Sequence, residues 1–208
     1  MNTSVGYLFV KRVIDILGAI IGIVITSPLF LTVSLMYLFG RSRGPLFFKQ
    51  LRYGKNGKFF NIYKFRSMVE NADGRLKENK ELYRKYLQNN YKLEPNEDPR
   101  ITKLGSFLRR TSLDELPQLL NVIKGEMSLV GPRPIVNEEL NEYKEKSEEF
   151  LSVKPGLTGY WQISGRSSVG YPERVNLELH YVYNQSIYFD IKILFQTLLI
   201  VLLKKGAY

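Results

Sequence analysis

The amino-acid sequence predicts an α+β fold, organised as a single compact domain associated with a membrane. Three features of the chain predict this class: an apolar N-terminal segment, two adjacent β-prone segments joined by a glycine-rich turn, and helix-prone segments through most of the remainder. The length of 208 residues suits one domain, or one domain with a membrane element. A hydrophobic content of 44% excludes a mainly disordered chain.

The apolar N-terminal segment covers residues 13–39 and contains one charged side chain, Asp15. It is longer than the roughly 20 residues that cross a membrane. Pro28, preceded by Ser27, removes a helical donor in the middle of the segment, so we expect a kink there. The two helical halves would be about 21 Å and about 17 Å long, and neither alone crosses a hydrocarbon core of about 30 Å.

Both flanks of this segment are basic: Lys11 and Arg12 precede it, and Arg41 and Arg43 follow it. Positive residues are retained on the cytoplasmic side of a membrane, so both ends are expected on that side. A helix that enters one leaflet and returns satisfies this pattern. An ordinary kinked spanning helix also agrees with the hydrophobicity, because proline is tolerated in spanning helices.

The rest of the chain alternates between β-prone and helix-prone composition. Segments 46–53 and 58–65 are β-prone, and the turn 54–57 between them is typical of a hairpin. The helix-prone segments are 71–93, 101–110, 116–123, 136–151, 173–183 and 187–203. The last of these is apolar but interrupted by charges, which is typical of an interfacial or docked helix. Residues 155–170 are rich in Gly and Ser, and we expect a functional loop there.

The composition excludes several kinds of catalytic site. The chain has no cysteine, so it has no disulfide, thiol nucleophile or thiolate metal site. Its one histidine, His180, excludes a histidine-rich zinc cluster and argues against a Ser-His-Asp hydrolase, and we assign it no role. Acid–base or nucleophilic chemistry is therefore expected from carboxylates, with lysines and arginines binding anions.

The charge of the chain indicates an anionic partner. The formal net charge is +10, and in residues 1–70 the acidic side chains are Asp15 and Glu70 alone. A basic front half favours a lipid headgroup, a nucleic acid or a phosphorylated substrate as the partner. Composition alone does not choose among these three.

The most informative segment places two carboxylates, Asp114 and Glu115, after basic residues and before a predicted helix. Pro117 fits the first turn of that helix, where its missing N–H is not needed. A carboxylate near the positive helix terminus and near Arg109 stays ionised and could attack a phosphorus centre. The alternative is a capping box, because Ser112 and Glu115 have the spacing of one.

Other basic side chains lie in settings that suit phosphate. Arg133 lies in the rigid turn 131–134, where Pro134 favours an extended conformation of the arginine. Lys64 and Arg66 lie on the same face of an extended segment, where they could grip a phosphate. In each case the alternative is a solvated surface side chain.

The loop around Trp161 supplies an aromatic ring, the amide of Gln162 and the cation of Arg166, flanked by glycine. This combination suits a nucleobase or a sugar. The alternative is that Trp161 fills the core.

Taken together, these segments resemble the monotopic phosphoglycosyl transferases, the bacterial sugar transferase family, which includes undecaprenyl-phosphate sugar phosphotransferases. The resemblance runs almost from end to end, and the order and spacing of its motifs make it specific. The segments that carry it are 11–15, Ser27-Pro28, 63–68, 108–118, 121–134, 154–159, 161–166 and 190–194.

The resemblance implies an enzyme that moves a sugar-1-phosphate from a UDP-sugar to a polyprenyl phosphate, usually undecaprenyl phosphate, with release of UMP. Such an enzyme acts on the cytoplasmic face of the bacterial inner membrane and begins glycan assembly there. The Ser-Pro break of the family makes the N-terminal helix re-entrant, here at Ser27-Pro28. We therefore expect a re-entrant helix-hairpin over residues 1–43 and a cytosolic catalytic region over 44–208, within one domain. The expected partners are the two substrates and membrane lipids, without nucleic acid, and oligomerisation stays open.

The resemblance also implies roles for single residues. Asp114 is the expected nucleophile, which forms a phosphosugar intermediate and gives ping-pong kinetics, and Glu115 helps to hold Mg²⁺. The expected ligands of phosphate, nucleotide or sugar are Lys64, Arg66, Arg109, Arg133, Gln162 and Arg166. Two positions depart from the family: many relatives carry Asp in place of Glu178, and some carry Asn in place of Ser164. The role of Glu178 is left open.

A second hypothesis is a non-catalytic basic protein of the membrane surface that binds anionic lipid or nucleic acid. The net charge and the basic, aromatic hairpin 46–66 motivate it. It predicts salt-dependent binding that does not depend on Asp114. The absence of a recognition motif in the sequence argues against its nucleic-acid version.

Overall fold

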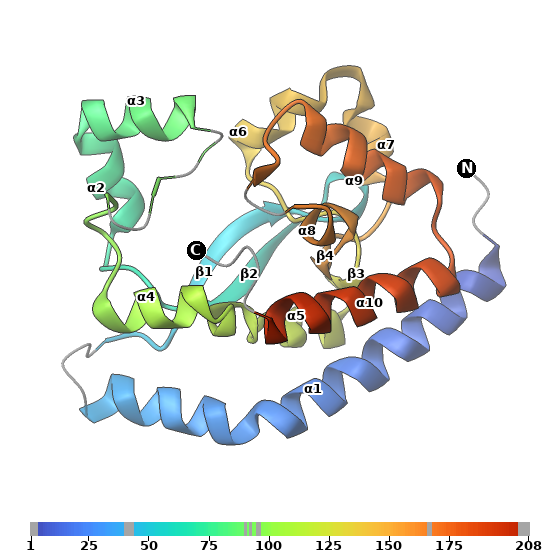
Figure 1. Cartoon of the computed structure of the whole chain (residues 1–208), viewed down its shortest axis with the longest axis horizontal. Helices are drawn as coiled ribbons and strands as arrows, with labels where there is room; N and C mark the ends of the chain where they lie inside the picture. The colour runs from blue at the N-terminus through green and yellow to red at the C-terminus, as the bar shows by residue number, and fades with distance from the viewer. Residues whose placement is uncertain are drawn as a thin grey trace.

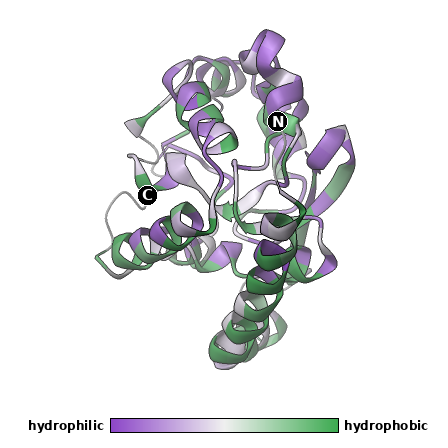
Figure 2. Ribbon diagram, turned by 90° about the vertical axis from the view of Figure 1, so that its right-hand side faces the viewer, coloured by the Kyte–Doolittle hydropathy of each residue, from purple (hydrophilic) through white to green (hydrophobic). Residues whose placement is uncertain are grey.

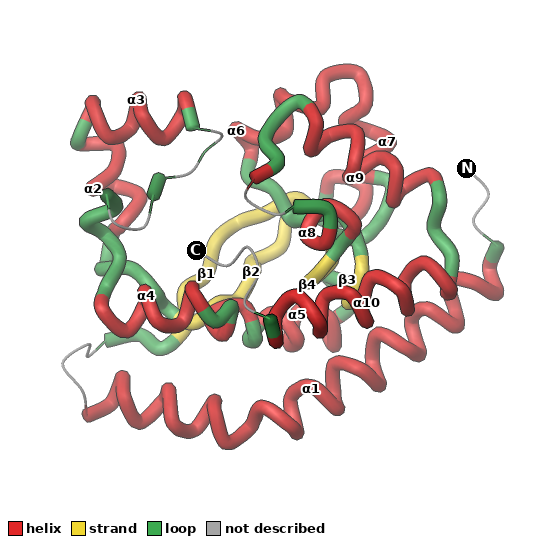
Figure 3. The backbone as a smooth tube through the Cα atoms, in the orientation of Figure 1, coloured by secondary structure: helices red, strands yellow, loops and turns green. Residues whose placement is uncertain are grey.

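The computed structural model describes residues 4–39, 44–89, 91, 93–94, 97–165 and 168–203. It combines helices with two small sheets, as the predicted α+β class requires. The strands lie at the centre and the helices surround them, with the long helix α1 beneath (Figures 1 and 3). The elements are α1 (Val5–Phe39), β1 (Phe47–Tyr53), β2 (Phe59–Phe65), α2 (Ala72–Glu78), α3 (Lys80–Gln88), α4 (Lys103–Arg110), η2 (Leu113–Glu115), α5 (Gln118–Lys124), β3 (Ser128–Val130), α6 (Asn137–Leu140), η3 (Asn141–Lys146), α7 (Ser147–Leu151), β4 (Gly156–Thr158), α8 (Tyr160–Ile163), α9 (Glu173–Tyr183) and α10 (Ile187–Leu202).

The predicted hairpin is confirmed. Strands β1 and β2 pair antiparallel, with Phe48 opposite Lys64 and Arg52 opposite Phe60. The turn between them contains Asn56 with a φ of 57°, a left-handed conformation that asparagine tolerates. Because side chains alternate along a strand, Ile62 and Lys64 lie on the same face of the sheet as Arg52. This face carries side chains to the site described below.

Three of the predicted elements differ in the structure. The helix-prone segment 71–93 forms two helices, α2 and α3, because Asn79 between them has an extended backbone conformation. The single helix predicted over 136–151 is divided into α6, η3 and α7, because Lys144 has a φ of 47° that interrupts the helix. The loop predicted over 155–170 contains β4 and α8, and β4 pairs parallel with β3 through Ser128 and Gly156. Strands of three residues are too short to show the alternation by which a strand is predicted.

Helix α1 is continuous through Pro28, and it begins at Val5, earlier than the predicted segment. Pro28 has no N–H for the carbonyl of Val24, and the hydroxyl of Ser27 donates to that carbonyl instead, at 2.9 Å. The predicted separate halves are therefore one helix, and Figure 1 shows it bending beneath the domain. Its 35 residues make it about 52 Å long.

The N-terminal half of α1 is tied to the domain by buried polar contacts. Lys11 Nζ lies 2.7 Å from Asp190 Oδ2 on α10. The carboxylate of Asp15 accepts hydrogen bonds from the Ser128 hydroxyl and the Leu129 N–H, both at 2.9 Å. Asp15 therefore joins the apolar helix α1 to β3, which explains why this apolar segment contains one charged residue.

The C-terminal half of α1 packs against the same domain. Val33 and Tyr37 are buried in a cluster with Phe65 and Leu108. The Tyr37 hydroxyl also donates to the backbone carbonyl of Arg66. Both halves of α1 therefore contact one body.

Large apolar side chains of α1 and α10 face outward. Among the described residues, α1 is the one helix long and apolar enough to cross a membrane by length and composition. In Figure 2 the helices at the bottom of the view are mostly hydrophobic and those at the top are more hydrophilic. The most exposed apolar residues of the two helices include Phe9, Val24, Ile25, Leu31, Leu38, Ile191, Phe195 and Leu198. These surfaces are suited to lipid.

Asn121 joins α5 to the hairpin. Its side chain is 0% exposed; Nδ2 donates to the carbonyl of Asn61 at 2.8 Å and to Glu126 Oε2 at 2.7 Å, and Oδ1 accepts from the N–H of Tyr63 at 3.0 Å. The amide thus pairs with the edge of β2 as a neighbouring strand would. It holds the middle of α5 against β2, at the residues that precede Lys64.

We expect Asn121→Ala to destabilise the fold, because it leaves a strand N–H and a strand carbonyl buried without partners. The expected loss in the free energy of unfolding is about 2–3 kcal/mol. Thermal unfolding of the detergent-solubilised protein measures it, as a midpoint lowered by at least about 5 °C. Asn141→Ala, at an exposed position of η3, is the control. Unchanged unfolding of Asn121→Ala would contradict this role.

Candidate active site

Asp114 lies in the turn that joins α4 to α5. The chain turns at Ser112, which has a φ of 55°, and forms the single turn η2 before Pro117 begins α5. The side chain of Ser112 makes no capping hydrogen bond, and that of Glu115 is directed to Lys64, so the alternative of a capping box is not what is observed. Asp114 is 6% exposed. The turn thus presents a nearly buried carboxylate.

The surroundings of Asp114 shift the pKa of its carboxyl in opposite directions. Burial is the largest influence, and it raises the pKa of the Asp114 carboxyl to about 6. Lys64 opposes the rise, and Glu115 adds to it. Arg109 and Arg133 also lower the pKa. A carboxyl with this pKa is mostly ionised at neutral pH and is a stronger base than an exposed aspartate. Among the described residues none donates a hydrogen bond to it.

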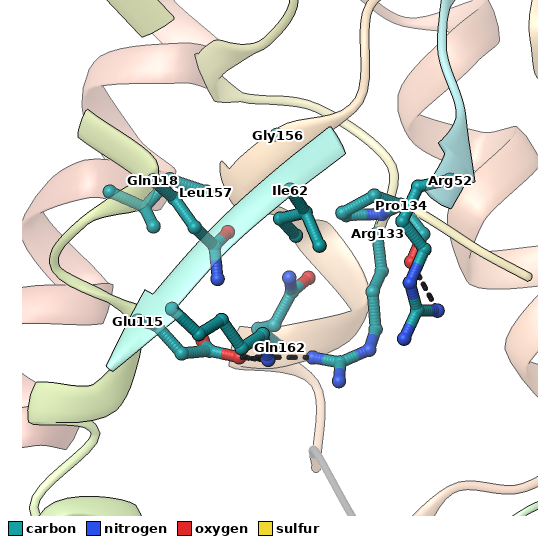
Figure 4. A pocket seen from close by; sticks show the side chains of 10 residues that line it. Arg52, Ile62, Glu115, Gln118, Arg133, Pro134, Gly156, Leu157 and Gln162 are labelled. Carbon is teal, nitrogen blue, oxygen red and sulfur yellow. Dashed lines mark hydrogen bonds and ion pairs between the residues drawn. The ribbon is translucent and has the colours of Figure 1, made fainter. Parts of the chain in front are cut away.

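Glu115 faces cations from two other segments. Its Oε1 lies 2.7 Å from Lys64 Nζ on β2 and 3.8 Å from Arg133 Nη1. Figure 4 shows Glu115 and Arg133 pointing toward each other at a pocket. The pocket is lined by Arg52, Ile62, Lys64, Glu115, Gln118, Arg133, Pro134, Gly156, Leu157 and Gln162.

Arg133 is held firmly in the turn 131–134. Its backbone N–H donates to Glu178 Oε2 at 2.9 Å, and the next carbonyl, that of Pro134, accepts from Arg52 at 3.2 Å. The Arg133 guanidinium lies 5.8 Å from the centre of the Trp161 ring, within cation–π range. The structure therefore places Arg133, one of the predicted phosphate ligands, at the pocket.

The other two predicted arginines of known position lie outside the pocket lining. Arg109 donates to the Ser67 hydroxyl at 2.9 Å, although its charge reaches Asp114. Arg66 donates to the carbonyl of Pro45 at 2.9 Å and lies 5.2 Å from the centre of the Tyr37 ring. Arg109 thus contributes to the potential at Asp114, whereas Arg66 contacts the C-terminal half of α1.

The loop around Trp161 contributes to the pocket in part. Gln162 lines the pocket, and its Oε1 is buried without a hydrogen-bond partner among the described residues. Trp161 is buried and contacts Arg133. Arg166 lies outside the described residues. His180 is exposed and stacks near Tyr160, at 4.9 Å between ring centres.

The site offers two carboxylates to a metal ion. Among the described residues, no group of three or more His, Cys, Asp or Glu side chains is placed to hold one. Mg²⁺ is commonly held by one or two carboxylates together with substrate phosphates and water. The Glu115 carboxylate at the pocket fits Mg²⁺ in that way, when a phosphate-bearing ligand supplies further oxygens.

Sequence reasoning missed Gln118 and Arg52, which both line the pocket. Gln118 is the first residue of α5 and lies within segment 108–118, which the sequence already singled out, so its position was a usable signal. Arg52 reaches the pocket from the far strand of the hairpin, which no local pattern reveals.

Comparison with known proteins gives a consistent set of relatives. Residues 6–204 match the family model described as bacterial sugar transferase. An undecaprenyl-phosphate galactose phosphotransferase of Salmonella typhimurium is 48% identical over 203 residues, which are 96% of this chain and 42% of that protein. The exopolysaccharide production protein ExoY of Sinorhizobium fredii is 47% identical over 202 residues, which are 95% of this chain and 88% of that protein.

A third relative is a UDP-glucose:undecaprenyl-phosphate glucose-1-phosphate transferase of Escherichia coli, 40% identical over 206 residues, which are 95% of this chain and 41% of that protein. The chain thus spans less than half the length of some relatives and most of the length of others. Because the family model covers nearly the whole sequence and the identity to relatives is high throughout, the chain belongs to the bacterial sugar transferase family.

Proposed function

We propose that this chain is a phosphoglycosyl transferase that moves a sugar-1-phosphate from a UDP-sugar to undecaprenyl phosphate and releases UMP. The observation that carries the proposal is the nearly buried Asp114 carboxylate with Lys64, Arg109 and Arg133 around it. The names of two relatives, which contain undecaprenyl phosphate and UDP-glucose, support the choice of substrates.

The reaction proceeds in two displacements. In the first, a carboxylate oxygen of Asp114 attacks the sugar-bearing phosphorus; the new O–P bond forms as the diphosphate bridge breaks, and UMP leaves with the bridging oxygen and its electron pair. In the second, an oxygen of undecaprenyl phosphate attacks the aspartyl phosphosugar and frees Asp114. Because the two anionic substrates use one site in turn, ping-pong kinetics follow.

The basic residues around Asp114 make the first attack feasible. A carboxylate and a diphosphate repel each other, and Lys64 and Arg133 offset that repulsion from two sides of the pocket. Mg²⁺, held by Glu115 together with the diphosphate, would stabilise the charge of the leaving UMP. Gln162 and Gln118 present amide groups to the donor at the same pocket.

We further propose that α1 is re-entrant and that the chain lies on the cytoplasmic face of the membrane. The support is that both halves of α1 contact one domain, through Asp15 and Lys11 at one end and through Val33 and Tyr37 at the other. A helix that crossed the bilayer would place its ends on opposite sides, about 30 Å of hydrocarbon apart. A shallow helix instead brings the site to the depth of lipid phosphates.

We expect Asp114→Asn to abolish UMP release from UDP-sugars in the presence of undecaprenyl phosphate and Mg²⁺, because an amide is not a nucleophile toward phosphorus. The wild-type protein, incubated with donor and without acceptor, should carry a phosphosugar adduct on Asp114 that mass spectrometry detects. Asp73→Asn, at an exposed position of α2, is the control and should retain activity.

Normal turnover by Asp114→Asn would refute the assignment of the nucleophile. If no UDP-sugar yields UMP and the protein only binds anionic vesicles in a salt-dependent way, the non-catalytic membrane-surface hypothesis is favoured instead.

The metal assignment predicts that EDTA removes activity and that Mg²⁺ restores it. Glu115→Gln should raise the Mg²⁺ concentration for half-maximal activity by about tenfold or more, because a neutral amide then replaces the carboxylate that holds the ion. Titration of UMP release with Mg²⁺ measures this. Glu126→Gln, at a carboxylate that accepts from Asn121 outside the pocket, is the matched control. Full activity in EDTA would contradict the assignment.

The topology is tested with single cysteines at position 5, where α1 begins, and at Lys49, which is exposed on β1. The chain has no native cysteine, so labelling is unambiguous. We expect a membrane-impermeant maleimide to label neither site in intact cells and both sites in inverted membrane vesicles. Labelling of one site from each side would mean that α1 spans the membrane.

A further inference from the structure

Glu178 is a buried acid whose role the proposed reaction does not use. It lies on α9, is 1% exposed, and accepts the backbone N–H of Arg133 at 2.9 Å. The residues on both sides of Arg133 are Pro132 and Pro134, which have no N–H. The hydrogen bond to Glu178 is therefore made by the one backbone donor of that Pro-Arg-Pro turn.

Glu178 belongs to a chain of buried ion pairs. Arg174, which is 2% exposed, lies between two acids: its Nε is 3.4 Å from Glu178 Oε1 and its Nη1 is 3.0 Å from Glu139 Oε1. Glu139 in turn lies 3.3 Å from Arg52. This group of four ion-paired residues has two positive and two negative side chains, so its formal charges cancel.

Glu178 and Arg52, at the two ends of this group of ion pairs, both bind the turn 131–134. Glu178 holds the N–H of Arg133, and Arg52 donates to the carbonyl of Pro134 at 3.2 Å. The turn is thus fixed before and after the arginine by side chains that are themselves fixed by one another. A residue that precedes proline is also restricted to an extended backbone.

The Trp161 ring connects the same group to the Arg133 side chain. The Arg174 guanidinium lies 4.4 Å from the centre of that ring, and the Arg133 guanidinium lies 5.8 Å from it. Arg174 thus contacts the ring beside which the Arg133 side chain lies, and the indole N–H of that ring donates to the carbonyl of Val169 at 3.0 Å. The buried ion pairs therefore hold the Arg133 backbone and contact the ring beside its side chain.

We infer that Glu178 is a positioning residue for donor binding: acting with Arg174, it fixes Arg133 so that its guanidinium meets the diphosphate of the nucleotide sugar. The inference rests on the proposed function for the identity of the ligand. It goes beyond that function because it assigns the positioning of Arg133 to Glu178 on α9. A purely structural Glu178 would stabilise the fold without any particular effect on donor affinity.

Hydrogen–deuterium exchange measures directly how firmly Glu178 holds the Arg133 amide, and it does not depend on an activity assay. Because proline has no amide hydrogen, a peptide from the wild-type protein that covers 130–134 isolates the Arg133 amide from its nearest neighbours. We expect this amide to exchange at least tenfold faster in Glu178→Leu than in the wild-type protein. The control is Asp190→Asn, which alters another buried carboxylate, paired with Lys11 at α1. It should leave Arg133 exchange unchanged even where it lowers the unfolding temperature.

Kinetics then test the purpose of the hold. We expect Glu178→Leu to raise the KM for the UDP-sugar by about tenfold, as when one charge-assisted contact to phosphate is lost, with kcat changed by less than about threefold. Arg133→Ala should raise the same KM, and the double variant should be no worse than Arg133→Ala alone. If Glu178→Leu does not fold, Glu178→Gln should show changes in the same direction of about threefold, since a neutral acceptor binds the N–H less strongly.

Several outcomes overturn the inference: unchanged Arg133 exchange, an equal rise in KM for Asp190→Asn, or effects of Glu178 and Arg133 variants that multiply. If instead the wild-type protein releases no UMP from any UDP-sugar, the proposed function fails, and the exchange measurement still decides whether Glu178 holds Arg133. The two failures are therefore distinguishable.

Discussion

The attachment of both halves of α1 to one domain is the constraint on which the rest of the structure depends. Leu113 and Leu116, on either side of Asp114 in the chain, pack against the cluster that contains Val33 and Tyr37 of α1. The carboxylate is thus fixed relative to the most lipid-suited surface of the molecule. In the proposed reaction, such a position lets a lipid-borne phosphate and a water-borne nucleotide meet.

Two groups of charges lie side by side near the pocket, and their balances differ. In the group of ion pairs that links Glu178 through Arg174 and Glu139 to Arg52, the formal charges cancel, and the side chains are buried or nearly so. Around Asp114 and Glu115 the cations Lys64, Arg109 and Arg133 exceed the acids, so an anion is attracted. The neutral ion pairs hold the turn that carries Arg133, and the excess cations attract an anion to the pocket. Arg133 belongs to both groups, through its backbone in the first and its guanidinium in the second.

Sequence patterns predicted the elements whose signal is local. The hairpin was predicted because its two β-prone segments and the turn between them are contiguous in the sequence, and helix 173–183 was predicted to the residue. Strands β3 and β4 were missed because three residues carry little pattern, and their pairing joins segments far apart in the chain. Arg174 was missed for a related reason: a buried cation is recognised by its partners, and its partner Glu139 lies on another helix.

The buried ion pairs are better explained by geometry than by stability. Removing two acids and two bases from water costs about as much as their mutual attraction returns, and well-packed apolar residues of similar volume usually stabilise a fold at least as well. Here Arg174 retains a buried nitrogen, Nη2, without a partner among the described residues, which makes the group a still weaker source of stability. What apolar residues cannot do is accept the N–H of Arg133 or donate to the carbonyl of Pro134. The group therefore holds the turn that carries Arg133 in one conformation. In the proposed reaction, a diphosphate that meets a fixed guanidinium would not bear the entropic cost of ordering it.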